Sequence, residues 1–153
     1  MAGIVDKFSA AGLKIFGPTA AAARLEGSKV FAKNLFKKYG IPTARFEEFD
    51  DHDAARAFAH DLLKEGRPLV IKVDGLAAGK GVVIASTQED ADQALASMMK
   101  DKSFGTAGDK IIIEEFLEGE EVSFFAISDG QDFVPLIAAQ DHKQIYDGDQ
   151  GPN

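Results

Sequence analysis

Hydrophobic residues recur along the chain with two different periods. Helical spacing of the apolar positions predicts helices over residues 1–8, 19–39, 50–64 and 87–98. Short apolar runs bounded by turn residues predict strands over residues 13–16, 43–49, 69–73, 82–85, 110–116, 121–127 and 133–139. From Thr19 onward the order is helix, strand, helix, two strands, helix and three strands, which indicates an α/β chain of the α+β type.

The predicted helices have distinct apolar and solvated positions. In the helix over 19–39 the apolar positions are Leu25, Val30, Phe31 and Leu35, and the expected solvated positions are Lys29, Lys33 and Lys37. Gly40 is expected to end this helix. Thr87 and Asp90 have the spacing of a capping box at the start of a later helix. We also expect His52 and His60 to be solvated.

Composition excludes several classes of protein. The chain has 153 residues, 45% of them hydrophobic and 27% charged, as in a globular protein of about one domain. It has no cysteine, which excludes disulfides and thiolate sites and suits a reducing compartment. A net charge of −8 argues against a nucleic-acid partner. No apolar run approaches the ~20 residues that span a bilayer, so we expect a cytoplasmic protein that does not bind membranes.

The segment 75–81, GLAAGKG, joins two predicted strands in a glycine-rich hairpin. Glycines let backbone N–H groups approach phosphate oxygens, and Lys80 adds a point charge. The segment differs from a P-loop in its glycine spacing, in Gly81 at the usual Ser/Thr position and in the strand that follows. Lys72, between apolar neighbours on the preceding strand, either reaches solvent or has an anionic partner. The alternative is a flexible turn that binds nothing.

A second segment, 111–121, has the features of a nucleoside site. A strand that ends near Glu115–Leu117 exposes backbone N–H and C=O groups suited to the adenine edge. Glu121, after the turn at Gly119, is a candidate acceptor for ribose hydroxyl groups. The alternative is an acidic surface turn. Lys72, the hairpin and this acidic segment occur in the order that an ATP site between two sheets requires.

Four long blocks carry a resemblance to a known family. The blocks RLEGSKVFAKNLFKKYGIPTA, PLVIKVDGLAAGKGVVIA, IIIEEFLEGEEVSFFAISDG and AAQDHKQIYDGDQGPN resemble the ATP-grasp portion of phosphoribosylamine–glycine ligases. The resemblance covers essentially the whole chain. It implies an ATP-grasp fold, with the small ATP-grasp subdomain and part of the central or C-terminal antiparallel sheet.

The resemblance also implies how the chain is divided. Residues 1–16 would be the tail of a preceding N-terminal domain, and residues 17–41 a linking helical segment. Residues 42–115 would form the small subdomain with the glycine-rich hairpin. Residues 116–153 would begin a second, truncated subdomain. We therefore expect an internal fragment that is inactive alone, from a monomeric parent enzyme.

The family resemblance implies roles for individual residues. Lys72 and Lys80 would be the catalytic residues that contact the ATP phosphates. The remaining ATP-binding positions would be Gly75, Gly79, Gly81, Glu114, Glu115, Phe116, Leu117 and Glu121. Contacts to glycine or 5-phosphoribosylamine would come from Asp141, His142, Lys143, Asp149 and Asn153. Gln144 departs from the basic residue that the family has at its position.

The implied reaction joins glycine to 5-phosphoribosylamine through a glycyl phosphate, with ATP converted to ADP and phosphate in purine biosynthesis. The Mg²⁺ or Mn²⁺ ligands are expected outside this chain, so no metal ligand is assigned within it. Two alternatives stay open: another ATP-grasp carboxylate–amine ligase or carboxylase, and a non-catalytic nucleotide-binding module. The segments QDHK and DGDQGPN distinguish the expected ligase from other ATP-grasp enzymes. A measurement of ATP binding tests the non-catalytic alternative.

Overall fold

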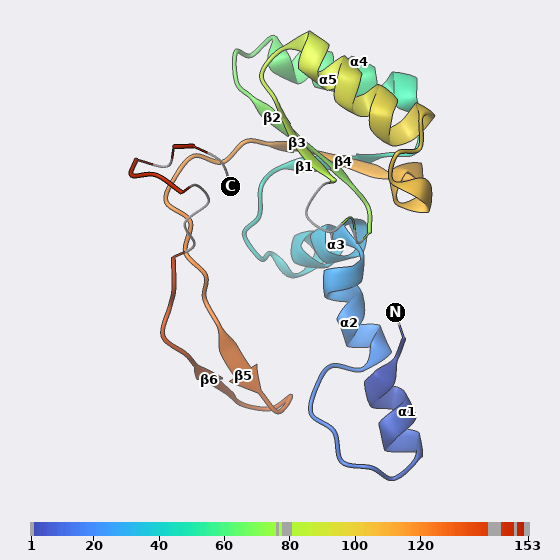
Figure 1. Ribbon diagram of the computed structural model, residues 1–153, viewed down its shortest axis with the longest axis vertical. Coiled ribbons are helices and arrows are strands. Elements are labelled where there is room, and N and C mark those ends of the chain that lie inside the picture. The colour runs from blue at the N-terminus through green and yellow to red at the C-terminus, as the bar shows by residue number, and fades with distance from the viewer. Residues whose placement is uncertain (1, 76, 78–80, 141–144, 149, 152–153) are drawn as a thin grey trace. The chain divides into compact units, whose positions relative to one another are not determined.

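The computed structural model describes residues 2–75, 77, 81–140, 145–148, 150 and 151. The chain forms two compact units, Met1–Leu117 and Glu118–Asn153, each with its own sheet (Figure 1). Within the described ranges, no helix is both long and apolar enough to cross a bilayer.

The first unit begins with helices α1 (Ile4–Ala10), α2 (Ala20–Gly27) and α3 (Lys29–Tyr39). The single helix predicted over 19–39 is therefore divided at Ser28, which has an extended backbone. The Ser28 hydroxyl accepts a hydrogen bond from the Phe31 N–H at 3.0 Å, so it caps α3. The strand predicted over 13–16 is wrong, because those residues form coil. An apolar run becomes a strand only where a second strand pairs with it.

A four-stranded antiparallel sheet follows in the order β1-β4-β2-β3. Its strands are β1 (Phe46–Phe49), β2 (Leu69–Val73), β3 (Val82–Ala85) and β4 (Ile111–Glu115). The bounds of β2 and β3 are those predicted, because both are continuous apolar runs rich in β-branched residues and end at turn residues. The hairpin between them is confirmed by their antiparallel pairing.

Helices α4 (His52–Leu63) and α5 (Gln88–Leu95) cover one face of this sheet (Figure 1). The predicted capping box is confirmed: the Thr87 and Asp90 side chains each accept a hydrogen bond from the other residue's backbone N–H. A π-helical turn, Ala96–Lys100, extends α5, and a 3₁₀ helix, Gly105–Asp109, leads into β4. The core between these helices and the sheet includes Leu69, Ile71, Val73, Ile111 and Ile113.

The alternate residues of β2 and β4 point to the opposite face of the sheet, where α3 lies (Figure 1). Lys72 on β2 pairs with Ile112 on β4, and Glu114 pairs with Val70, so Lys72 and Glu114 are diagonal neighbours on this face. One face of the sheet therefore packs an apolar core against α4 and α5, and the other carries buried charge.

The second unit contains a hairpin of β5 (Ala126–Ser128) and β6 (Phe133–Pro135). Both strands are shorter than predicted, although an isolated bridge between Ser123 and Ala139 continues the pairing. The predicted turn after Ser128 is present, and the Asp129 side chain accepts hydrogen bonds from the N–H groups of residues 131 and 132 at 2.9 Å.

Candidate functional site

A pocket of about 520 Å³ lies beside α3 on the charged face of the first unit's sheet. Three lysines line it: Lys29 and Lys33 from successive turns of α3, and Lys72 from β2. Glu26 from α2, Glu114 from β4, and Gly75 and Gly81 at the two ends of the hairpin also line it. The pocket therefore combines local positive charge with backbone at which a ligand can approach closely.

Glu114 is the central polar group of this pocket. Its side chain is only 5% exposed, and its Oε2 atom is 3.1 Å from Lys33 Nζ and 3.0 Å from Lys72 Nζ. Its Oε1 atom is buried and has no hydrogen-bond partner within the described part of the chain. A buried carboxylate is stable when cations pair with it, whereas an unpaired buried oxygen is costly. The site thus has one acceptor that a ligand donor can satisfy.

The two lysines that contact Glu114 differ in how fully they are engaged. Lys33 also donates to Thr43 Oγ1 at 2.7 Å and to the Ala44 carbonyl at 3.4 Å, and it lies over the Phe46 ring. Lys72 is more exposed, and Glu114 is its one polar partner among the described residues. An ammonium group has three donors. Lys72 therefore has donor capacity left for an anion in the pocket.

These contacts correct one expectation and decide another. Lys33 was expected to be solvated, which is wrong, because it is buried between α3 and the sheet. Lys72 has the anionic partner that the sequence offered as one possibility, and that partner is Glu114. The spacing of Lys29 and Lys33, four residues apart on one helix face, was the available signal for their shared location.

In the hairpin that follows β2, the structure requires glycine at two positions. Gly75 has φ +117°, which a side chain would strain. A Cβ atom on Gly81 would lie 2.4 Å from Val73 Cγ2. Lys29 Nζ donates to the Gly75 carbonyl at 2.8 Å, which fixes the base of the hairpin to α3. The predicted site residues Gly79 and Lys80 lie outside the described residues.

Glu115, at the end of β4, is engaged by Arg45 rather than by the pocket. The Arg45 backbone N–H donates to Oε1 at 2.8 Å, and Nε donates to Oε2 at 3.0 Å. This backbone bond and the guanidinium hold the pKa of the Glu115 carboxyl below its usual value. The side chain is thus occupied, and the Glu115 backbone N–H also donates, to the Arg45 carbonyl at 3.0 Å, so neither group is left for a base.

The other predicted residues are less closely constrained. Phe116 and Leu117 follow β4 and are exposed. Glu121 belongs to the second unit and has an interaction partner. The predicted substrate residues Asp141, His142, Lys143, Asp149 and Asn153 lie outside the described residues.

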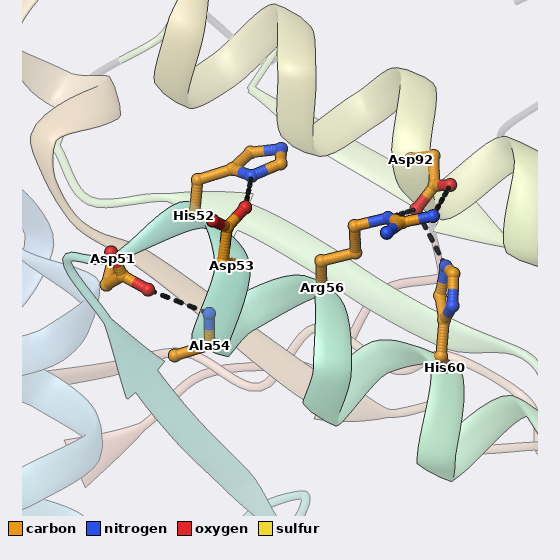
Figure 2. Close-up of polar contacts among 7 residues, drawn as sticks. All are labelled: Asp51, His52, Asp53, Ala54, Arg56, His60 and Asp92. Atoms are coloured by element: carbon orange, nitrogen blue, oxygen red, sulfur yellow. Dashed lines mark hydrogen bonds and ion pairs between the residues drawn. The ribbon is translucent and has the colours of Figure 1, made fainter.

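A second polar cluster lies on the outer surface, where α4 meets α5 (Figure 2). Arg56 donates to both oxygens of Asp92 at 2.8 and 2.9 Å, and His60 Nε2 lies 2.7 Å from Oδ1. The Arg56 guanidinium and, to a smaller extent, His60 lower the pKa of Asp92 to about 2. His60 was expected to be solvated, which is wrong: its side chain is 19% exposed and bonded to Asp92. Both oxygens of this carboxylate are already satisfied.

Comparison with known proteins decides the family. The family model for the phosphoribosylglycinamide synthetase ATP-grasp (A) domain matches residues 27–153. The chain belongs to the phosphoribosylglycinamide synthetase ATP-grasp family. A phosphoribosylamine–glycine ligase from Streptococcus pneumoniae is 55% identical over 152 residues, which are 99% of this chain and 36% of that protein. The chain thus spans about a third of the length of this relative.

Solved structures confirm the ATP-grasp fold that the sequence predicted. The crystal structure of phosphoribosylamine–glycine ligase from Thermotoga maritima is 42% identical, with a TM-score of 0.78, over 90% of this chain and 34% of that chain. D-alanyl-alanine synthetase A from Vibrio cholerae has a TM-score of 0.72 at 14% identity, over 88% of this chain and 39% of that chain. The second likeness concerns the fold alone.

Proposed function

We propose that the pocket beside α3 binds ATP, and that the chain provides this site to a phosphoribosylamine–glycine ligase. The observation that carries the proposal is the convergence of Lys29, Lys33 and Lys72 on one pocket that also contains Glu114 Oε1, which has no partner among the described residues. Phosphate oxygens accept hydrogen bonds from ammonium groups, whereas the adenine amino group donates one. A nucleoside triphosphate offers both complements in one molecule.

The proposed contacts follow from which atoms have capacity left. Lys72 donates to phosphate oxygens, because Glu114 uses only part of its donor capacity. Lys80 and the backbone at Gly75, Gly79 and Gly81 cover the same phosphates. This arrangement stabilises the negative charge that accumulates as the terminal phosphoryl group is transferred.

The adenine end is assigned to β4 and the residues after it. Glu114 Oε1 accepts a hydrogen bond from the 6-amino group. The Glu115 carbonyl and backbone groups of Phe116 and Leu117 meet the remaining base edge, because the Glu115 side chain and N–H are both held by Arg45. Glu121 accepts hydrogen bonds from the ribose hydroxyl groups. This assignment gives Glu114 a role through its side chain as well as through its place on the strand.

In the proposed reaction a glycine carboxylate oxygen attacks the γ-phosphorus of ATP, and ADP leaves. The amine of 5-phosphoribosylamine then attacks the acyl carbon, loses a proton and releases phosphate as the amide forms. Asp141, His142, Lys143, Asp149 and Asn153 contact these two substrates. Mg²⁺ or Mn²⁺ would neutralise phosphate charge. We assign the metal to ligands outside this chain, as the family resemblance implies.

The proposal includes the setting of the enzyme: a monomer that acts on small molecules in the cytoplasm, and neither on nucleic acid nor at a membrane. The net charge of −8 and the absence of cysteine are consistent with that setting.

Calorimetry with ATP and Mg²⁺ tests the binding proposal. Lys72→Met removes the partly free ammonium, and we expect it to weaken ATP binding about tenfold or more, because a charged hydrogen bond contributes about 1.5–3 kcal/mol. Arg56→Met is the matched control, since it removes the same charge from the outer surface. Equal ATP affinity in the wild type and Lys72→Met would contradict the proposal.

A further inference from the structure

Asp74 connects the end of β2 to the beginning of α3. Its Oδ1 atom accepts a hydrogen bond from the Val30 backbone N–H at 3.1 Å, and its Oδ2 atom accepts one from the Ser28 hydroxyl at 3.2 Å. The first N–H groups of a helix have no partner within the helix, and the helix dipole favours negative charge there. Asp74 therefore caps a helix that lies 44 residues earlier in the sequence.

A third hydrogen bond joins the same two segments. Lys29, in the first turn of α3, donates from Nζ to the carbonyl of Gly75, the residue after Asp74. The connection thus has three hydrogen bonds, two accepted by Asp74 and one by Gly75. Together they fix where the first turn of α3 lies relative to the end of β2.

This connection holds together the two elements that carry the cations of the pocket. Lys72 lies two residues before Asp74 on β2, and Lys33 lies one turn after Lys29 on α3. Both ammonium groups meet at a single atom, Glu114 Oε2. Three-way contacts of this kind depend on the separation of helix and strand, because hydrogen bonds weaken steeply when their geometry is lost.

We propose that Asp74 is a positioning residue for the nucleotide site: by capping α3 from the end of β2, it holds Lys33 and Lys72 at the spacing that presents Lys72 and Glu114 Oε1 to the nucleotide. Asp74 itself acts through α3 and does not need to touch the ligand. A displacement of about 1 Å in a supporting residue is enough to change activity substantially in other enzymes. The inference rests on the proposed ATP site.

The experiment compares Asp74→Ala with Asp51→Ala in the 153-residue chain. Asp51 is a matched control, because its Oδ1 atom caps α4 by accepting the Ala54 N–H at 2.8 Å, and α4 contributes no residue to the pocket (Figure 2). We expect Asp74→Ala to weaken ATP binding about tenfold and Asp51→Ala to change it less than about twofold. Equal effects of the two changes on ATP affinity would overturn the inference, since the loss of any helix cap would then explain the result.

A second measurement needs no nucleotide. The ¹³C resonance of the Glu114 carboxyl reports its contacts with Lys33 and Lys72, and we expect it to move in Asp74→Ala and to stay in place in Asp51→Ala. If wild-type chain fails to bind ATP, the proposed function fails, while this resonance still decides whether Asp74 positions the cluster. An unchanged resonance in Asp74→Ala would overturn the positioning role even if ATP binds.

Asp74→Asn keeps the inference testable if Asp74→Ala does not fold. The amide oxygen still accepts the Val30 N–H, but the negative charge and the acceptor for Ser28 are lost. We expect about a threefold loss of ATP affinity and an intermediate shift of the Glu114 resonance. Wild-type values in both measurements would overturn the inference.

Discussion

Glu114 and Asp92 are both carboxylates held by two basic side chains, but on opposite sides of the same sheet. Arg56 and His60 engage both oxygens of Asp92, whose side chain is about one-third exposed. Lys33 and Lys72 both contact one oxygen of Glu114 and leave the other buried without a partner in the described residues. The Asp92 cluster is complete and joins two helices. The Glu114 cluster has one oxygen without such a partner, and that supports the proposal that it is a ligand site.

The largest expected difference is in stability. Glu114→Ala leaves two ammonium groups close together without their shared counterion, so we expect the free energy of unfolding to fall by about 3 kcal/mol. Asp92→Ala breaks a partly exposed cluster, and we expect a loss of about 1 kcal/mol or less. Urea unfolding of both variants measures this difference. Equal losses would contradict the distinction between a buried charge cluster and a surface one.

A smaller effect is expected on base selectivity. In Glu114→Gln the amide oxygen is expected to face the two lysines, which places the NH₂ group where Oε1 meets the adenine amino group. Two donors then face each other, whereas the 6-oxo group of guanine would accept from that NH₂. We expect the preference for ATP over GTP to fall about tenfold, as for one hydrogen bond.

Asp92→Asn is the control for this change of selectivity, because it makes the same chemical substitution on the outer surface. Competition of the two nucleotides for binding provides the measurement. Wild-type selectivity in Glu114→Gln would contradict the assignment of Glu114 Oε1 to the adenine amino group.

The smallest expected effect is on the pH dependence of stability. Arg56 and His60 lower the pKa of Asp92 to about 2, below the value of about 3.9 expected in the unfolded chain. The ionised Asp92 therefore stabilises the fold above about pH 4, and this contribution is lost as the pH falls towards 2. Solvent screening limits it to about 1 kcal/mol. The stability difference between wild type and Asp92→Asn, followed by urea unfolding, should shrink over that range; a constant difference would argue against the cluster's charge.

The sequence predicts best where local pattern alone determines structure. The strands 69–73 and 82–85 and the capping box of Thr87 and Asp90 depend on neighbouring residues, and all three are confirmed. The failed strand at 13–16 depends on a pairing partner that no local pattern specifies. The division between α2 and α3 was missed because the apolar positions continue across Ser28, although the Gly27–Ser28 pair was a signal.

The candidate site follows the same physical rule. Lys72 was identified from its own strand, because a lysine between apolar strand residues must reach solvent or have an anionic partner. The burial of Lys33 and the role of Asp74 depend on contacts with residues far away in the sequence, so helical spacing alone placed Lys33 in solvent. Family resemblance supplied Glu114 as an adenine residue, but its shared contact with two lysines required the register of β2 and β4.

A crystal structure of this chain with Mg²⁺ and a non-hydrolysable ATP analogue tests the central claim most directly. The account predicts nucleotide density in the pocket beside α3, with phosphate oxygens within hydrogen-bond distance of Lys72 Nζ and the adenine amino group at Glu114 Oε1. Density for the nucleotide at any other surface, with this pocket empty and the Glu114 contacts unchanged, would contradict it.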